Sequence, residues 1–441
     1  MLTSPRLQPR ALLRRARHAP LAHESGWSFA LELSSLTATI LSFTLLGRSL
    51  GPAGYGSYAA LYALIGPLVT LAASGITLAL LQHALANRES LEETARSCFS
   101  LSLLLGVPLT VVGAALVVLW LDLEALTAVA IGSILLTEFL ISPLVQIGAA
   151  TVQAGDGFVG SAKIRLVVVG CRVAILVGLA VMGALNVTNL GVSMLAVTSV
   201  LAIGVLVRVG RQFGFAFMPG RVHLRHLKSN LLFSGGSASF AAQNDGDKAV
   251  LAANRFVIDT GLYAAAYRIV QLGMLPVTSV LSATHNRFLE NDDLIVGQHL
   301  RRSIRFAASA AVYGVVFMIA IVLAAPLLPL VLGDEFQGSV QMTRVLSGLV
   351  LLRALSVFPL NGLLGLRRTA LRTALTACGA AVSITLYFLL IPRWGWTGAA
   401  TGTLIGEGSL VVAAWIALFV CQRRDDRDAM LAHPDLIDAA P

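Results

Sequence analysis

Long hydrophobic runs recur along the chain from Trp27 to Cys421, separated by short stretches that are polar or rich in glycine and proline. A helix needs about 20 mostly apolar residues to cross a bilayer. The pattern predicts twelve such helices, at residues 27–47, 57–81, 98–121, 125–150, 166–185, 190–207, 229–253, 261–284, 306–332, 341–364, 370–391 and 397–421. We therefore expect an all-α integral membrane protein.

The composition excludes a soluble enzyme. Of the 441 residues, 56% are hydrophobic and 12% are charged, about half the roughly 25% of charged residues in soluble proteins. The four cysteines lie far apart in or beside apolar runs, without a Cys-x-x-Cys pair, and predict neither a disulfide framework nor a zinc site. We expect no cofactor and no metal. The cysteines are Cys98, Cys171, Cys378 and Cys421.

The net charge of +9 could suggest a nucleic-acid partner, but the basic residues concentrate in alternate loops. By the positive-inside rule this distribution places both termini in the cytoplasm and predicts no nucleic-acid binding. The apolar run that starts at Trp27 lacks a small-x-small cleavage site, so we expect the first helix to be retained. The predicted segments are a basic tail at 1–26, six-helix bundles at 27–218 and 219–421, and a cytoplasmic tail at 422–441.

An internal repeat relates the two halves. After the first span, Arg48 precedes a glycine-containing turn and a Tyr-Ala-Ala-x-Tyr sequence, and Arg255 does the same after the seventh span. Six spans per repeat give both halves the same orientation, as in parallel-repeat transporters. We predict two pseudo-symmetric six-helix bundles around a central cavity. The repeated tyrosines are Tyr58 and Tyr62, and Tyr263 and Tyr267.

The first span of each predicted bundle is unusually polar. Serine and threonine hydroxyls can bond to their own helix, so helix packing and a cavity wall are both open interpretations. Ionised groups in hydrocarbon cost about 2.5–3.5 kcal/mol each and must meet water, substrate or one another. Local ion pairing is an alternative to a functional role for several of them, including Asp245 and Lys248. The predicted spans contain Glu32, Glu138, Arg172, Asp245, Asp247, Lys248, Arg268, Arg344, Arg353 and Glu407.

The sequence favours transport over membrane-enzyme chemistry. Membrane hydrolases and glycosyltransferases need positioned carboxylates or nucleophiles, usually on a sizeable loop, and the predicted outward loops are short. We interpret Asp122 and Glu124 as a solvated turn, and His223 and His226 as an HxxH without further ligands. The chain has no GxxxxGK[ST] sequence for ATP binding.

Several short motifs are spread over nearly the whole chain: Gly47–Tyr58, Asp245-Gly-Asp-Lys248 with Gly261–Arg268, Leu332–Phe336, Asn361–Arg367 and Ile391–Ala400. Together they resemble the polysaccharide-transport branch of the multidrug/oligosaccharidyl-lipid/polysaccharide (MOP) exporters, the Wzx-type flippases. Such flippases move undecaprenyl-diphosphate-linked oligosaccharide from the cytoplasmic to the periplasmic leaflet of the bacterial inner membrane for O-antigen, capsule or exopolysaccharide assembly, by alternating access.

The resemblance implies a lipid-linked oligosaccharide as substrate and the bilayer as surroundings, with H⁺ or Na⁺ coupling and a polysaccharide polymerase with its chain-length machinery as further candidates. A diphosphate calls for cationic donors, for which Arg268, Lys248, Arg48 and Arg255 are the candidates. Tyr58, Tyr62, Tyr263 and Tyr267 are candidates for glycan contacts, and Glu32, Asp245, Asp247 and Glu407 for ion coupling. The alternatives are a drug antiporter of the same superfamily, a lipid II flippase, and a membrane polymerase or ligase.

Overall fold

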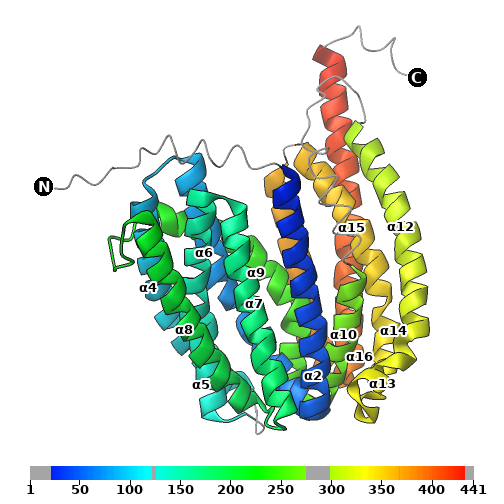
Figure 1. Ribbon diagram of the computed structural model, residues 1–441. Coiled ribbons are helices and arrows are strands. Elements are labelled where there is room, and N and C mark those ends of the chain that lie inside the picture. The colour runs from blue at the N-terminus through cyan, green and yellow to red at the C-terminus, as the bar shows by residue number, and fades with distance from the viewer. Residues whose placement is uncertain (1–20, 122–125, 275–297, 367, 433–441) are drawn as a thin grey trace, which may run out of the picture. The chain divides into compact units, whose positions relative to one another are not determined.

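The computed structural model describes residues 21–121, 126–274, 298–366 and 368–432 (Figure 1). Every regular element within these ranges is a helix, which confirms the predicted all-α class. Most of the basic tail, the acidic pair Asp122 and Glu124, and the end of the C-terminal tail lie outside the described residues.

The chain divides into two compact units, Met1–Ala238 (unit 1) and Ser239–Pro441 (unit 2), and the division falls within helix α9. Unit 1 begins with α2, which packs on α7, while α5 and α6 both pack on α8. Its elements are α2 (Leu21–Val69), η1 (Thr70–Ser74), α3 (Gly75–Leu81), η2 (Gln82–Ala86), α4 (Leu91–Trp120), α5 (Ala128–Leu136), η3 (Thr137–Ile141), α6 (Ser142–Asp156), α7 (Phe158–Val181), α8 (Val187–Phe213) and the first part of α9 (Leu224–Ala253).

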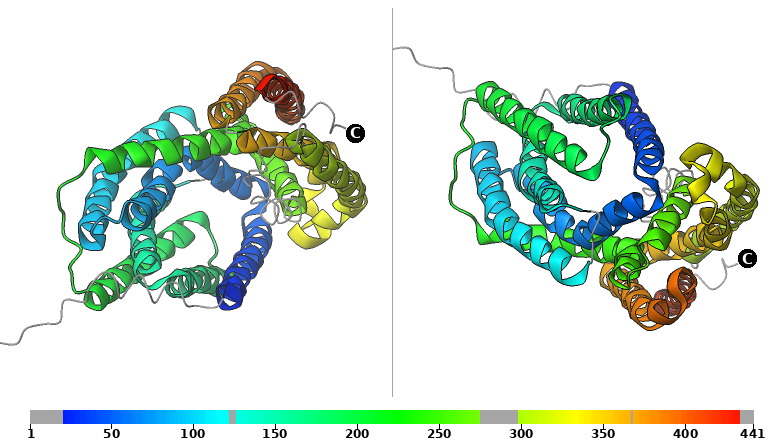
Figure 2. Two further views of the ribbon diagram at one scale, coloured as in Figure 1. Left: turned by 90° about the horizontal axis from the view of Figure 1, so that it is seen from above. Right: turned by 90° about the horizontal axis from the view of Figure 1, so that it is seen from below.

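Unit 2 is built around α15, which packs against both α12 and α16; the views from above and below show these helices side by side (Figure 2). Its elements are the rest of α9, α10 (Val257–Gly273), α12 (Gln298–Ala324), η4 (Ala325–Leu327), α13 (Leu328–Leu332), η5 (Asp334–Phe336), α14 (Ser339–Leu346), α15 (Gly348–Gly365) and α16 (Thr369–Ala432).

Eight helical segments among the described residues are long and apolar enough to cross a membrane. Two of them, Gly26–Ala86 and Thr369–Asp425, are each long enough for two of the predicted spans. The seventh predicted span corresponds to α9, which is too polar to be counted among these eight. The eighth corresponds to α10, which has 17 residues, and residues 275–284 of this predicted span lie outside the described residues. The twelve predicted spans thus all have helical counterparts.

The turns expected after the first and eleventh spans lie inside α2 and α16, each of which consists of two helices joined at a non-helical residue. In α2 this residue is Gly51, with φ 62° and ψ 180°, and in α16 it is Gly395, with φ 55° and ψ −132°. Glycine adopts positive φ without the steric cost that a Cβ atom would impose. Pro52 follows Gly51 directly and disfavours the α conformation of the residue before it. Each glycine therefore ends one helix and lets the next begin almost at once.

The junction between α9 and α10 is a tight helix end. Arg255 has φ 66°, the Phe256 amide donates to the Leu251 carbonyl at 3.1 Å, and the Arg255 amide donates to the Ala252 carbonyl at 2.9 Å. These are the two hydrogen bonds of a Schellman cap, in which glycine usually occupies the left-handed position. An arginine in this position carries backbone strain of about 1–3 kcal/mol.

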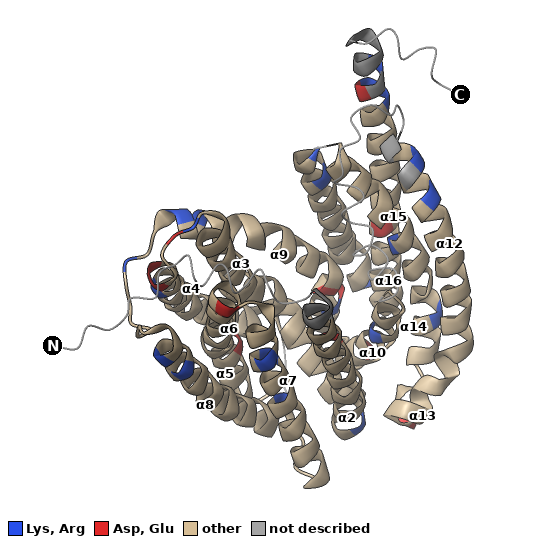
Figure 3. Cartoon of the chain, turned by 45° about the horizontal axis from the view of Figure 1, so that its top comes forward, with Lys and Arg blue, Asp and Glu red and all other residues tan. Residues whose placement is uncertain are grey.

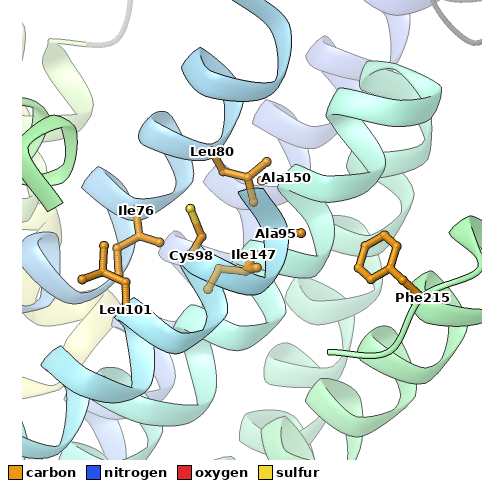
Figure 4. Packing of buried hydrophobic residues seen from close by; sticks show 8 residues of the cluster. All are labelled: Ile76, Leu80, Ala95, Cys98, Leu101, Ile147, Ala150 and Phe215. Atoms are coloured by element: carbon orange, nitrogen blue, oxygen red, sulfur yellow. The ribbon is translucent and has the colours of Figure 1, made fainter. Parts of the chain in front are cut away.

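The core of unit 1 is an apolar cluster contributed by α3, α4 and α6 and by the segment after α8 (Figure 4). Cys98 lies in this cluster and is fully buried, as expected of a small core residue. The cluster comprises Ile76, Leu80, Ala95, Cys98, Leu101, Ile147, Ala150 and Phe215.

A close contact at Gly75 joins α3 to the first half of α9. Two backbone carbonyls of the π-helical turn η1 accept hydrogen bonds from α9: Leu71 O from Asn230 Nδ2 at 3.2 Å and Thr70 O from Ser234 Oγ at 3.2 Å. A Cβ atom at Gly75 would overlap Ser234 Oγ and lie 2.6 Å from the Asn230 carbonyl oxygen. Only glycine fits here.

We therefore expect Gly75→Ala to lower the free energy of unfolding by about 1–3 kcal/mol through overpacking. Thermal unfolding of the detergent-solubilised protein measures the effect. Gly132→Ala in α5 is the matched control, because a Cβ atom there has no neighbour within 4 Å. Equal melting temperatures for the two variants would show that the contact at Gly75 is not tight.

Candidate functional site

Charged residues are sparse along the described helices, and a buried group of them lies within unit 2 (Figure 3). The second half of α9 supplies most of its charges, and α10, α15 and α16 supply the partners. We call this group the α9 cluster; it comprises Asn244, Asp245, Asp247, Lys248, Tyr263, Tyr267, Arg353, Tyr387, Thr403 and Glu407.

The Lys248 ammonium group occupies the middle of the α9 cluster. It donates to the Asn244 carbonyl at 2.8 Å, to Asp245 Oδ1 at 2.9 Å and to Asp247 Oδ1 at 3.2 Å. Its Nζ atom also lies 3.8 Å from the ring centroid of Tyr267, which adds a cation–π contact. An ammonium group has three donors, so these three acceptors use all of them.

Asp247 is fully buried, and both of its oxygens are bonded. Its Oδ2 accepts from the Tyr263 hydroxyl at 2.9 Å and from Thr403 Oγ1 at 3.3 Å. The Tyr387 hydroxyl lies 3.0 Å from the same Thr403 oxygen and 3.2 Å from the Gln243 carbonyl oxygen. Hydroxyls from α10 and α16 thus surround a carboxylate supplied by α9.

Arg353 on α15 connects the remaining polar groups of the cluster. Its Nε donates to Glu407 Oε1 at 3.0 Å, and one terminal nitrogen lies 2.6 Å from both Asn244 Oδ1 and the Tyr267 hydroxyl. The Tyr267 hydroxyl itself donates to Asn244 Oδ1 at 2.6 Å. The side chains of Arg353 and Glu407 are 11% and 6% exposed, so this ion pair is largely removed from solvent.

The formal charges of the α9 cluster do not cancel. Three carboxylates, on Asp245, Asp247 and Glu407, face two basic groups, on Lys248 and Arg353. One negative charge is left when all five groups are ionised. An excess carboxylate charge in a poorly solvated place favours binding of a proton or a small hard cation, which takes oxygen ligands.

The structure brings together six of the residues proposed from sequence, with Glu407 joined to the others through Arg353. The other five are Lys248, Tyr263, Tyr267, Asp245 and Asp247. The predicted alternative of a local Asp245–Lys248 ion pair is present at 2.9 Å.

The other proposed cations lie outside the cluster. Arg268, on α10, is exposed, and its guanidinium donates to Gln271 Oε1 at 3.2 Å on the same helix. Arg48 and Arg255 are exposed too, Arg48 just before the kink of α2 and Arg255 at the end of α9.

The remaining candidates belong to unit 1. Tyr58 and Tyr62 are half-buried on α2, with ring centroids 4.7 Å apart, and the Tyr62 hydroxyl donates to Glu138 Oε1 at 3.3 Å. Glu138 also lies 3.8 Å from the Arg172 guanidinium, in line with ion pairing as the alternative role of charged residues in the spans. Glu32 is exposed on α2. The nearby hydroxyls of Thr37 and Thr39 bond to carbonyls one turn earlier in the same helix, at Leu33 and Ser35.

Sequence reasoning did not propose four members of the α9 cluster as site residues. Arg353 stood out as a charged residue in an apolar span, but nothing in the sequence indicated that it meets Asn244 and Tyr267. Tyr387 and Thr403 lie on α16 on the two sides of the kink at Gly395. Single hydroxyl-bearing residues are common in apolar helices, so nothing in the sequence marked Tyr387 and Thr403 as site residues.

Unit 1 contains a cavity of about 590 Å³ between α6, α7 and α8. Its walls are mostly valine, leucine and glycine, and Lys163, Arg208 and Asp156 are among the charged residues that line it. The Lys163 ammonium also lies 5.4 Å from the ring centroid of Trp27 on α2.

The described helices and their apolar lengths define a multi-spanning helical membrane protein with a buried ionic network in unit 2. Residues 45–341 match the family of polysaccharide biosynthesis proteins. The chain belongs to this family. No curated protein matches the chain.

Solved structures show that the fold is that of the MOP transporters. An inward-facing multidrug resistance MATE transporter of the MOP superfamily is 17% identical, with a TM-score of 0.69 over 90% of this chain and 95% of that one. The lipid II flippase MurJ, in an inward closed conformation, is 11% identical, with a TM-score of 0.66 over 91% of each chain. A MOP transporter from Pyrococcus furiosus, described as having a binding pocket of reverse polarity, is 16% identical, with a TM-score of 0.59 over 97% and 99%. These matches confirm the fold predicted from sequence.

Proposed function

We propose that this protein is a flippase that moves undecaprenyl-diphosphate-linked oligosaccharide across the bacterial inner membrane, from the cytoplasmic to the periplasmic leaflet, by alternating access. The observation that carries the proposal is the match to polysaccharide biosynthesis proteins over residues 45–341 of a chain with a transporter fold. The basic residues of alternate loops support a cytoplasmic position for both termini. The glycan would serve O-antigen, capsule or exopolysaccharide assembly, beside a polymerase and its chain-length machinery.

The exposed arginines are the proposed contacts of the diphosphate. Arg268, Arg48 and Arg255 present guanidinium groups at exposed positions, and a guanidinium can bind phosphate oxygens in a bidentate manner. Lys248 has three acceptors already, so in this conformation it has no donor left for a phosphate. We therefore reassign Lys248 to the coupling network.

The α9 cluster is the proposed coupling site. Asp245, Asp247 and Glu407 would bind H⁺ or Na⁺, supported by their one excess negative charge over Lys248 and Arg353. Tyr263 and Tyr267 are at most 1% exposed, which favours a place in this network over a glycan-contacting surface. Tyr58 and Tyr62 are half-buried and remain the candidates for glycan contacts. Glu32 is exposed on α2 and stays a separate candidate for ion coupling.

The second candidate function is ion-coupled antiport of a drug or other small cation. The observation that favours it is the net negative α9 cluster in a fold shared with multidrug resistance MATE transporters. In that case Asp247 and Glu407 would bind the exported cation itself.

The test is complementation of a strain that lacks this gene, with mass spectrometry of the lipid-linked intermediates on the inner leaflet. We expect the deletion strain to accumulate an undecaprenyl-diphosphate-linked oligosaccharide and the intact gene to clear it. Accumulation of no such lipid, together with increased drug sensitivity, would support the antiporter instead.

Within the flippase proposal, we expect Arg268→Ala to reduce surface polysaccharide about tenfold or more at unchanged protein level, since losing a charge-assisted pair costs roughly 1.5–3 kcal/mol. Arg268→Lys should retain part of the activity because the charge remains. Arg393→Ala is the matched control, as Arg393 is an exposed arginine on α16. Normal polysaccharide in Arg268→Ala would remove this residue from the diphosphate path.

A further inference from the structure

Two histidines and a glutamate that are far apart in sequence converge at one end of unit 1. His83 lies in η2, Glu89 in the turn before α4, and His226 in the first turn of α9. Glu89 Oε1 is 2.9 Å from His83 Nδ1, and Glu89 Oε2 is 3.1 Å from His226 Nε2. One ligand atom from each of the three residues lies within 4.8 Å of the other two.

The two imidazole rings are buried and held in place. His226 is fully buried and His83 is 4% exposed, with ring centroids 4.4 Å apart. The nitrogen of each ring that faces away from Glu89 has a serine partner: His83 Nε2 lies 3.0 Å from Ser229 Oγ, and His226 Nδ1 lies 2.8 Å from Ser97 Oγ. Such outer partners fix the ring orientation and direct a lone pair at the site, as in metal centres.

The contacts of His83 Nδ1 allow either a hydrogen bond or a bound cation. This atom lies 2.9 Å from Glu89 Oε1 and 3.0 Å from the Asn87 amide nitrogen, and the tautomer of the ring decides whether it donates or accepts. In the tautomer in which Asn87 donates to Nδ1, a nitrogen lone pair faces a carboxylate oxygen. That pair of acceptors can then share a proton or a metal ion.

The charges around the site also matter. Arg225 donates to Glu89 Oε2 at 3.2 Å and lies 3.9 Å from Glu93 Oε1, while His223 pairs with Glu93 at 3.0 Å. The Arg225 side chain is half exposed and has Glu93 as a second acceptor close by. A metal ion on Glu89 would therefore shift Arg225 toward Glu93 and leave the arginine paired.

We propose that His83, Glu89 and His226 form a binding site for a divalent transition-metal ion of the zinc class, with a water molecule as the fourth ligand. Two imidazole nitrogens and one carboxylate oxygen are a donor set that zinc accepts. The sequence prediction of no metal rested on the isolated HxxH pattern; the fold supplies two ligands that the pattern lacked. Because the ligands come from three segments of unit 1, the ion would hold the start of α9 against the turn that precedes α4.

The experiment uses the full-length protein in detergent, stripped with a chelator and then titrated with ZnCl₂. We expect about one zinc per chain by elemental analysis after desalting, a rise in melting temperature with zinc, and no rise with MgCl₂. Ser97→Ala and Ser229→Ala should weaken zinc binding by about 10–100-fold, the usual effect of losing an outer partner. His83→Ala, Glu89→Gln and His226→Ala should abolish it.

His223→Ala is the matched control, because His223 lies 5.4 Å from His226 between ring centroids but pairs with Glu93. Its zinc content should equal that of the unmodified chain. If a ligand variant fails to fold, Co²⁺ added to the unmodified protein gives a second measurement, since a tetrahedral site has intense visible absorption. Absence of stoichiometric zinc and of that absorption, or equal zinc in the ligand variants, would overturn the proposal and leave a proton as the shared cation. The inference does not depend on the transported substrate.

Discussion

Lys248→Met is expected to destabilise the protein by about 3–5 kcal/mol and to abolish export, because it leaves Asp245 and Asp247 without their shared cation. Asp247 is fully buried, so water cannot replace the ammonium group. Thermal unfolding in detergent and surface polysaccharide in the complemented strain measure the two effects.

Two further variants separate stability from function. Lys228→Met makes the same chemical change at an exposed position of α9, and its free energy of unfolding should stay within about 0.5 kcal/mol of that of the unmodified protein. The double variant Lys248→Met with Asp247→Asn removes both charges and should recover most of the lost stability, because replacing a whole buried pair is often nearly neutral. Recovered stability without recovered export would indicate a functional role for the pair. A single Lys248→Met variant as stable as Lys228→Met would contradict the geometry described above.

Arg353→Met is expected to cost a similar 3–5 kcal/mol and to inactivate the protein, because Glu407, Asn244 and the Tyr267 hydroxyl all lose the same partner. The measurements are those used for Lys248. Arg353→Lys should recover only part of the stability, since an ammonium group lacks the planar fork that reaches several acceptors at once.

A double-mutant cycle with Glu407→Gln isolates the ion pair. If Arg353 and Glu407 interact as their 3.0 Å separation indicates, the losses of unfolding free energy in the two single variants should add up to more than the loss in the double variant. Additive costs would show that the pair contributes no coupling energy, and the inactivation would then have to arise through Asn244 or Tyr267.

Much of the fold could be predicted because its signal is local. About 20 apolar residues in a row indicate a spanning helix whatever surrounds them. The turns around Gly51 and Gly395 could also be predicted, because glycine and proline interrupt a helix locally. Their tightness could not, since a single non-helical residue separates the two helices of α2 and of α16. The central cavity and the bundle boundary near residue 218 stay predictions.

The candidate site could be predicted only in part. The charges of α9 stood out because ionised residues are rare in apolar spans, and the repeated tyrosines stood out through the internal repeat. Their partners Arg353, Tyr387 and Thr403 lie more than 80 residues away in sequence, and which turn of a helix meets α9 depends on packing. The proposed metal site could not be predicted for the same reason, because only the tertiary structure brings His83 close to His226.

The saturated Lys248 ammonium has one more consequence. The ammonium group donates to Asp245 and Asp247, two of the three carboxylates that would bind a mobile cation under the proposed function. It is therefore a tethered counter-ion that occupies oxygens which the mobile cation would need. An arriving sodium ion or proton must compete with a group that cannot diffuse away. The carboxylate oxygens would then be bound either by the Lys248 ammonium or by the incoming cation. In the absence of that cation, the protein would not have three unneutralised carboxylates in the membrane.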